Sequence, residues 1–231
     1  MKFVLRYLFV TISLIASTTL SAQLATWEVT GQNAAANNPL QATTLGSSIS
    51  SASLSIGGGI TASGSVDTFG GSAFNTTTLA DAITGGDYIS FTISPDSEYA
   101  ISVSSIAFNS GVSTAVTNFN VALLSSITGF TSANSLLTYN FSSTGAPAQS
   151  ITLSGVSLLQ NVNNAIEFRL YGWRDSAGTS TFRIRSLSGN DLVINGSVTA
   201  VPEPSTYAAI FGAVALLGTL FIRRRRRLII V

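Results

Sequence analysis

Carboxylates are the candidate catalytic groups of this 231-residue sequence, because it contains neither cysteine nor histidine. That absence excludes a thiol nucleophile, a Ser-His-Asp triad and a zinc site with thiolate or imidazole ligands. Asp96 and Glu98 would lie on one face of an extended strand, at a spacing that could suit the paired acids of a glycosidase. They occur, however, within Pro-Asp-Ser-Glu, which is typical of a solvated turn. We therefore expect no catalytic site.

Calcium is the metal that the composition leaves open, since it binds hard oxygen ligands on loops. The other acids in the middle of the chain are scattered along it: Glu28, Asp67, Asp81, Asp87, Glu167, Asp175 and Asp191. No Asp-x-Asp-x-Asp spacing occurs among them, so calcium binding is an alternative without a defined site. No other cofactor is predicted.

Charged residues alternate with apolar ones in two segments of the chain: Glu167, Arg169, Arg183 and Arg185. The alternation predicts two strands whose polar faces form a cross-strand ladder of ion pairs. The alternative is a polar binding face beside Tyr171 and Trp173, because aromatic planes suit the apolar face of a sugar ring. Tyr171 and Trp173 are therefore the candidate sugar contacts.

Alternation of apolar and polar residues with period 2 recurs along the middle of the chain, with Gly, Asn and Ser turns between the runs. It predicts strands at 88–94, 99–108, 118–124, 165–171, 181–187 and 191–198, and weaker ones at 27–30 and 48–56. A change of phase at Ser104-Ser105 predicts a β-bulge. Glycines 57–59 and 70–71 predict loops, and 33–38 predicts a polar connector. No segment has helical periodicity.

These strands predict an all-β fold, an antiparallel β-sandwich that forms one ectodomain over residues 23–200. A chain of this length can bury a core that is stable without disulfides. The predicted core residues lie on one face of each strand: Phe91, Ile93, Ile101, Val103, Phe119, Val121, Phe168, Leu170, Phe182, Ile184 and Val193.

The net charge of +1 hides an uneven distribution of charged residues. Residues 23–201 contain four bases and nine acids, so this part of the chain has a net charge of −5. The one basic run follows an apolar stretch, which is typical of a membrane stop signal rather than of nucleic-acid binding. This run consists of Arg223, Arg224, Arg225, Arg226 and Arg227. We therefore expect no nucleic-acid partner.

The first 22 residues have the three parts of a secretory signal peptide. Lys2 and Arg6 supply positive charge, residues 8–16 form an uncharged apolar core, and Ser21-Ala22 offers a cleavage site. The apolar core is too short to span a bilayer. Residues 1–22 therefore predict export and removal by signal peptidase.

The C-terminus combines a proline motif, an apolar stretch and an arginine cluster, in that order. Pro202 and Pro204 interrupt strand and helix formation, so they separate the sandwich from the apolar stretch. Residues 207–222 carry no charge and predict a transmembrane helix about 24 Å long, against about 30 Å for the hydrocarbon core. The arginine cluster at 223–227 would stay on the cytoplasmic side, and residues 228–231 form a short apolar tail.

This order resembles the PEP-CTERM sorting signal of exported bacterial proteins, over about residues 201–227. The motif itself comprises Val201, Pro202, Glu203, Pro204 and Ser205. The resemblance implies that an exosortase, an integral-membrane cysteine protease, recognises the motif and cuts near it. It also implies a bacterium with an extracellular polysaccharide, and an inner-membrane precursor that is sorted to the cell surface or extracellular matrix.

The middle of the chain is similar to jelly-roll sandwiches of the carbohydrate-binding kind, in short pieces at 87–93, 168–173, 181–184 and 191–196. This similarity implies a jelly-roll-like ectodomain. The leading hypothesis is a non-catalytic exported surface or matrix protein associated with extracellular polysaccharide. The first alternative is a carbohydrate-binding adhesin module, and the second is a glycan hydrolase.

Overall fold

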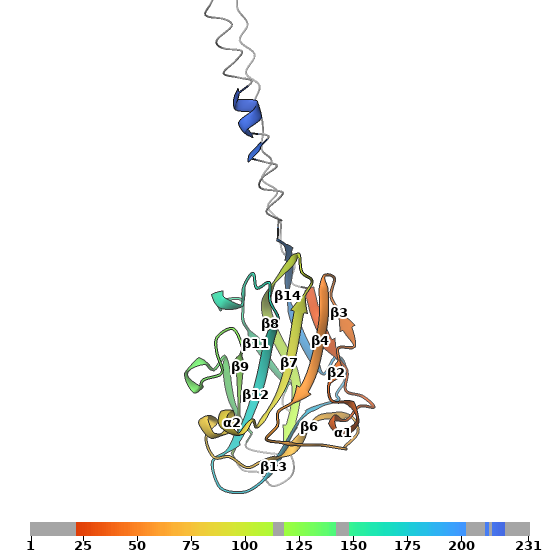
Figure 1. The fold of residues 1–231 in the computed structure, drawn as a ribbon. Coiled ribbons are helices and arrows are strands. Elements are labelled where there is room, and N and C mark those ends of the chain that lie inside the picture. The colour runs from red at the N-terminus through yellow and green to blue at the C-terminus, as the bar shows by residue number, and fades with distance from the viewer. Residues whose placement is uncertain (1–21, 113–117, 142–147, 202–210, 213, 220–231) are drawn as a thin grey trace, which may run out of the picture.

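Alternating residues give each strand of this protein one apolar face, and two sheets bury these faces against one another (Figure 1). The computed structural model describes residues 22–112, 118–141, 148–201, 211–212 and 214–219. Within these residues the chain is mostly β, with two antiparallel sheets packed as a sandwich. The predicted all-β sandwich is confirmed, and its finer jelly-roll-like description stays a prediction.

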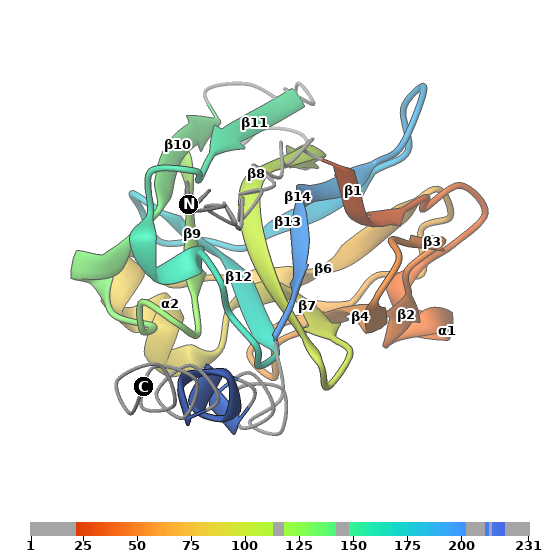
Figure 2. The same ribbon diagram turned by 90° about the horizontal axis from the view of Figure 1, so that it is seen from above.

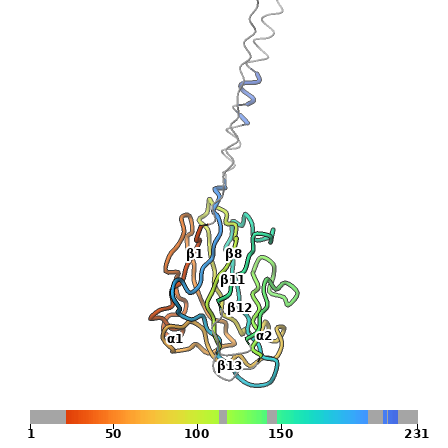
Figure 3. Tube along the Cα trace, turned by 180° about the vertical axis from the view of Figure 1, so that it is seen from behind, coloured from red at the N-terminus to blue at the C-terminus, as the bar shows by residue number. Residues whose placement is uncertain are grey.

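The first sheet has the order β3-β1-β14-β8-β13-β6-β5, with β11 also paired to β8, among the described residues. Its strands are β1 (Ala22–Trp27), β3 (Thr44–Leu45), β5 (Thr61–Ala62), β6 (Thr68–Phe74), β8 (Tyr99–Val112), β11 (Ala148–Thr152), β13 (Ser180–Arg185) and β14 (Leu192–Ala200). Figure 3 shows β1, β8 and β11 of this sheet from behind.

The second sheet has the order β10-β9-β12-β7-β4-β2. Its strands are β2 (Leu40–Gln41), β4 (Ile49–Ile56), β7 (Tyr88–Pro95), β9 (Phe119–Ser125), β10 (Leu137–Phe141) and β12 (Ile166–Arg174). The six strands predicted from strong alternation correspond to β7, β8, β9, β12, β13 and β14. The weaker prediction at 48–56 corresponds to β4, whereas β1 ends at Trp27, where a strand was predicted to begin.

Short helical segments also occur in the sandwich, where the sequence showed no helical periodicity: α1 (Ala34–Asn37), α2 (Leu79–Gly85), η1 (Ser132–Asn134) and η2 (Ser157–Leu159). The N-terminal cap of α2 is Thr78, whose hydroxyl accepts the Asp81 N–H at 3.1 Å and donates to its carboxylate at 2.7 Å. Gly86 ends α2 with a left-handed φ of 78°. Figure 2 shows α1 and α2 on opposite sides of the sandwich.

The predicted bulge at Ser104-Ser105 is confirmed in β8. Asn195 of β14 pairs with Ser105, whereas the next residue, Gly196, pairs with Val103. One extra residue in β8 therefore changes which of its side chains face inward, as the change of phase in the sequence indicates.

The loop predicted at residues 70–71 is wrong, because Gly70 and Gly71 lie within β6. A Cβ atom on Gly70 would lie 2.4 Å from the Phe182 carbonyl oxygen, and one on Gly71 would lie 2.3 Å from that of Thr61. Glycine is needed here for close contact between neighbouring backbones rather than for a turn. The predicted loop at 57–59 does connect β4 and β5.

The predicted core is confirmed except at Val193, which is only half-buried. In β14 the inward side chains are Leu192 and Ile194 instead. Phe182 of β13 lies at the centre of an aromatic cluster, with its ring centroid 5.6 Å from Phe119 and 5.8 Å from Phe74. Because Phe119 belongs to the second sheet, this cluster joins the two layers.

β14 is both the last strand of the sandwich and an interior strand of its sheet. It pairs with β8 from Leu192 to Ala200 and with β1 from Leu192 to Gly196. Ala22, the last residue of the predicted signal peptide, is the first residue of β1 and pairs with Gly196. The rest of the predicted signal peptide, residues 1–21, lies outside the described residues.

Candidate functional site

The predicted sorting motif begins directly where β14 leaves the sheet. Ala200 is the last paired residue of β14, opposite Tyr99, and the next N–H, that of Val201, donates to the Glu98 carbonyl at 2.7 Å. The Val201 side chain is 42% exposed. Since Pro202 is the next residue, no linker separates the sheet from the motif. The remaining motif residues lie outside the described residues: Pro202, Glu203, Pro204 and Ser205.

Asp96 and Glu98 lie in the turn between β7 and β8, at the end of the sandwich from which Val201 emerges. The Tyr99 N–H donates to the Asp96 carbonyl at 3.0 Å, and the Asp96 N–H donates to the Ser48 carbonyl at 3.0 Å. The prediction of a turn at this position is therefore confirmed, and the alternative of two acids sharing a strand face is wrong.

Part of the predicted apolar helix is described. Residues 211–212 and 214–219 are helical, and Phe211, Val214, Leu216 and Leu217 are exposed. Among the described residues, no helix combines the length and the apolar character that crossing a membrane requires. The rest of 207–222 lies outside the described residues.

The predicted membrane-stop cluster also lies outside the described residues, together with the tail 228–231. The cluster consists of Arg223, Arg224, Arg225, Arg226 and Arg227. Its position on the cytoplasmic side of a membrane therefore stays a prediction from the order of the sequence.

The outer face of β12 carries a second, small apolar core. Helix α2 covers this face, and its Ala82 belongs to one buried cluster with Tyr171 of β12 and with Ala122 and Leu124 of the neighbouring strand β9. Because the Tyr171 side chain is fully buried, the prediction that its ring stacks on a sugar is wrong. Trp173 is half-buried at the border of the same cluster, and its contact with a sugar stays a prediction.

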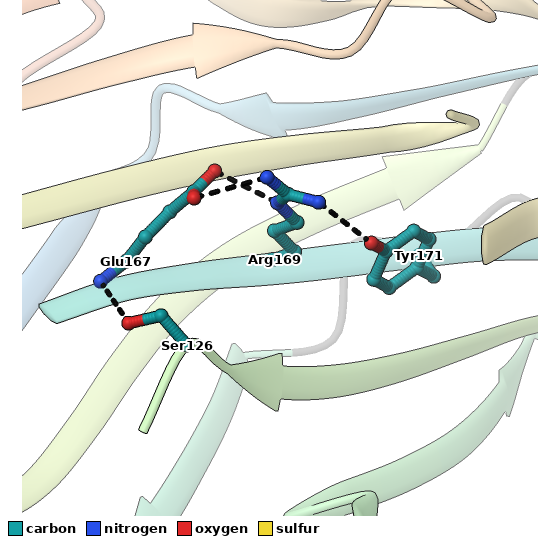
Figure 4. Close-up of polar contacts among 4 residues, drawn as sticks. All are labelled: Ser126, Glu167, Arg169 and Tyr171. Carbon is teal, nitrogen blue, oxygen red and sulfur yellow. Dashed lines mark hydrogen bonds and ion pairs between the residues drawn. The ribbon is translucent and has the colours of Figure 1, made fainter. Parts of the chain in front are cut away.

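Arg169 joins this small core to a polar network along β12, shown in Figure 4. Its guanidinium donates to both carboxylate oxygens of Glu167, at 2.8 and 3.0 Å, and to the Tyr171 hydroxyl at 3.1 Å. It also lies over the rings of Phe130 and Tyr88, at 3.9 and 4.4 Å from their centroids. Every nitrogen of this side chain therefore has a protein partner.

The hydrogen bonds of this network favour the charged form of Arg169. Burial alone would lower the pKa of Arg169, but its hydrogen bonds to Glu167 and Tyr171 outweigh that effect, and the pKa is raised. Burial also raises the pKa of Tyr171, so its hydroxyl stays protonated at neutral pH. At neutral pH a charged Arg169 guanidinium therefore donates to a protonated Tyr171 hydroxyl.

The predicted cross-strand ladder of ion pairs is wrong. Glu167 and Arg169 pair with each other along one strand, β12, in the second sheet, whereas Arg183 and Arg185 lie on β13, in the first sheet. The chain crosses between the layers after β12, which separates the two charged pairs. Arg183 and Arg185 instead line a hollow of about 200 Å³, together with Thr68, Gly111, Val112 and Thr181.

Two buried acids were not singled out in the sequence, although each directly precedes an apolar strand. Asp87 accepts the Thr76 hydroxyl at 2.9 Å. Asp191 accepts the N–H groups of Val29 and Leu187, both at 2.8 Å, and so ties the end of β1 to the loop before β14. Burial raises the pKa of both carboxyls against the lowering effect of these hydrogen bonds.

The raised pKa of Asp87 predicts a pH dependence of stability. Because the folded chain binds this proton more tightly than the unfolded chain, the Asp87 contribution to the free energy of unfolding falls as pH rises above 3.8. We expect the Asp87→Asn variant to lose less stability than the parent between pH 4 and 7. Urea unfolding of the full-length chain across this range measures the effect, and equal slopes for the two proteins would contradict it.

The acids of the sandwich do not gather into a metal site. Within the part of the chain that the structure describes, no group of three or more of them is placed to hold an ion. Calcium binding has therefore gained no defined site and stays an untested alternative.

Comparison with known proteins adds one match. The family model of the PEP-CTERM protein-sorting motif matches residues 200–227. No curated protein matches the chain. The match begins at the last residue of β14 and runs through the proline motif, the apolar stretch and the arginine cluster, as predicted from Val201 to Arg227. The chain therefore carries a PEP-CTERM sorting motif at its C-terminus, which implies an exported bacterial protein that an exosortase processes and that is sorted to the cell surface.

Proposed function

We propose that this chain is a non-catalytic protein of the bacterial surface or extracellular matrix that associates with extracellular polysaccharide. The observation that carries the proposal is the sorting motif at residues 200–227. The motif supplies the route out of the cell, and the sandwich is the part that remains to act there.

The positions of the chain ends support this topology. Ala22 pairs with Gly196, five residues before Val201, so the sandwich begins and ends close together in one sheet. This arrangement suits a precursor held in the membrane by a signal peptide and by a C-terminal helix. The sandwich can then fold outside the membrane while both ends are still attached.

The positions of the acids support a role without catalysis. Asp96 and Glu98 lie in a turn, and the buried Asp87 and Asp191 are engaged by hydrogen bonds that hold loops in place. A glycosidase needs two carboxyls across an open cleft, and none of these acids lines the hollow beside Arg183 and Arg185.

The proposal predicts where the protein accumulates. In cells that lack exosortase, we expect the full-length chain in the membrane fraction. In cells that keep exosortase but make no extracellular polysaccharide, we expect a shorter form that is lost to the medium instead of held in the matrix. Immunoblots of the membrane, matrix and medium fractions measure both effects. An unchanged distribution without polysaccharide would contradict the association, while leaving the sorting route intact.

A carbohydrate-binding adhesin is the second candidate, and the hollow beside Arg183 and Arg185 is the observation that favours it. A glycan array separates the two candidates, because a matrix protein held by many weak contacts gives no preferred glycan. Selective binding to a small set of glycans would favour the adhesin.

A further inference from the structure

The hollow on the outer face of β13 results from the residues on its neighbouring strands. Arg183 pairs with Gly111 of β8 on one side and with Gly70 of β6 on the other. Gly111 has no side chain, so the stem of Arg185 can lie across the sheet surface beside Arg183, whereas a Cβ atom on Gly70 would point into the core, 3.0 Å from Cδ1 of Ile89. A Cβ atom on Gly111 would lie only 2.6 Å from Cδ of Arg185, so the stem of Arg185 lies directly over this glycine.

The two arginines of this hollow have no acidic partner among the described residues, where the one ion pair is that of Glu167 with Arg169, in the other sheet. Nε of Arg183 is buried and has no hydrogen-bond partner there. Asp67 directly precedes Thr68, the residue that pairs with Arg185, and it uses its carboxylate to accept the Gly31 N–H at 2.7 Å. A buried polar atom without a protein partner is unusual in a folded chain, and a bound water or ion is one explanation for it.

The charges of the hollow favour an anion. Burial and the positive charge of Arg185 both lower the pKa of Arg183, because each makes its charged form less favourable. A bound anion would offset both effects. A guanidinium binds a carboxylate through two parallel hydrogen bonds, and such charge-assisted bonds are among the strongest in proteins.

The size and lining of the hollow restrict the anion. A volume of about 200 Å³ is smaller than the usual drug-sized pocket of about 300–1,000 Å³, and it suits one sugar residue better than a long chain. At its border the Thr68 hydroxyl donates to the Ser65 carbonyl at 2.8 Å, which leaves its oxygen able to accept a hydrogen bond from a sugar hydroxyl. The net charge of −5 over residues 23–201 repels a densely charged polyphosphate but opposes a single carboxylate much less.

We propose that Arg183 and Arg185 bind the carboxylate of a uronic acid residue in an extracellular polysaccharide. This inference rests on the proposed association with polysaccharide and adds the class of sugar and the residues that recognise it. Arg183, fixed between two glycines, meets the carboxylate at the floor of the hollow. Arg185, more exposed, closes over it from the rim.

Calorimetric titration of the full-length chain in detergent tests the proposal. The probes are trimers of galacturonate, glucuronate and mannuronate, their methyl esters, and inorganic phosphate. We expect at least one free acid to bind, its neutral ester to bind at least tenfold more weakly, and phosphate to bind no better than the ester. Tight binding of phosphate, or equal binding of acid and ester, would overturn the assignment to a uronate.

Matched variants separate recognition from folding. Arg183→Gln and Arg185→Gln should each weaken binding about tenfold or more without lowering the melting temperature, since neither side chain has an ion-pair partner to lose among the described residues. Gly111→Ala keeps every charge but displaces the Arg185 stem, and it should weaken binding as well. Arg174→Gln removes the same charge from the end of β12, outside the lining of the hollow, and should leave affinity unchanged. Unchanged affinity in the Arg183 and Arg185 variants would overturn the proposed site.

Failure of this inference differs from failure of the proposed function. If neutral polysaccharides hold the protein in the matrix while no uronate trimer binds, the association stands and the arginine site is wrong. If the protein reaches the medium equally with and without polysaccharide, the proposed association with the matrix is wrong. Uronate binding measured in the calorimeter would then indicate a different uronate-containing ligand.

Discussion

Replacing Pro202 and Pro204 with alanine is expected to stop release of the protein and to leave the full-length chain in the membrane fraction. The sorting motif covers residues 200–227, and the last backbone hydrogen bond of the sandwich before the prolines is made by Val201. Proline has no N–H to continue a ladder and fixes its own φ near −65°. Neither proline can therefore donate a hydrogen bond to extend the ladder of β14, and we expect this to keep the motif accessible to the protease.

Pulse-chase labelling with immunoblots of membrane and medium measures this loss of release, which we expect to exceed tenfold. The matched variant replaces all five arginines of 223–227 with serine and leaves the proline motif unchanged. It removes the charges that are predicted to hold the apolar stretch at the cytoplasmic side, so we expect the tail to slip outward instead of accumulating uncut. Release of the double-alanine variant at the parent's rate would show that the prolines are not recognised.

The Phe182→Ala variant is expected to lose about 3–5 kcal/mol of the free energy of unfolding, the usual cost of removing a buried aromatic ring. Phe182 is fully buried and contacts Phe74, Phe119 and Phe141, the last at 6.0 Å between centroids. Domains are typically stable by about 5–15 kcal/mol. This one change therefore threatens the fold, because the cavity opens where both sheets meet.

Urea unfolding of the full-length chain measures the loss, and Leu187→Ala is the control. Leu187 lies just after β13 and is 44% exposed, so its removal should change stability by less than about 0.5 kcal/mol. A loss in Phe182→Ala as small as that of the control would mean that the aromatic cluster does not hold the two sheets together.

Alternation predicted which side chains of a strand are buried where apolar and polar residues strictly alternate. It gave the wrong face where several apolar residues are consecutive. In β12 and β13, Phe168, Leu170, Phe182 and Ile184 alternate with charged residues, and each is buried as predicted. In β14 the run Leu-Val-Ile has no polar residue to set its phase, so Val193 was assigned to the wrong face. There the register with β1 and β8 decides which side chains point inward, and that register involves residues far apart in the chain.

The position of the candidate site depended even more on distant contacts. Nothing near Tyr171 in the sequence shows that α2 covers it, although Thr78 and Asp81 have the spacing of a helix cap. The hollow beside Arg183 is lined by residues of β6, β8 and β13, among them Thr68 and Gly111, which are distant in sequence and meet only in the sheet. The sorting motif was predictable because its three parts are contiguous.

The interior position of β14 decides how the protein bears tension while its C-terminus is attached. A pull on Val201 enters the sandwich along the axis of β14, which β8 holds along its full length and β1 holds over residues 192–196. Such a pull loads both ladders in shear, so many hydrogen bonds must break together, whereas an edge strand would peel away one bond at a time. Forced unfolding is governed by the rate at which these hydrogen bonds first break. A sandwich attached through β14 can therefore resist a pulling force at a cell surface without a disulfide.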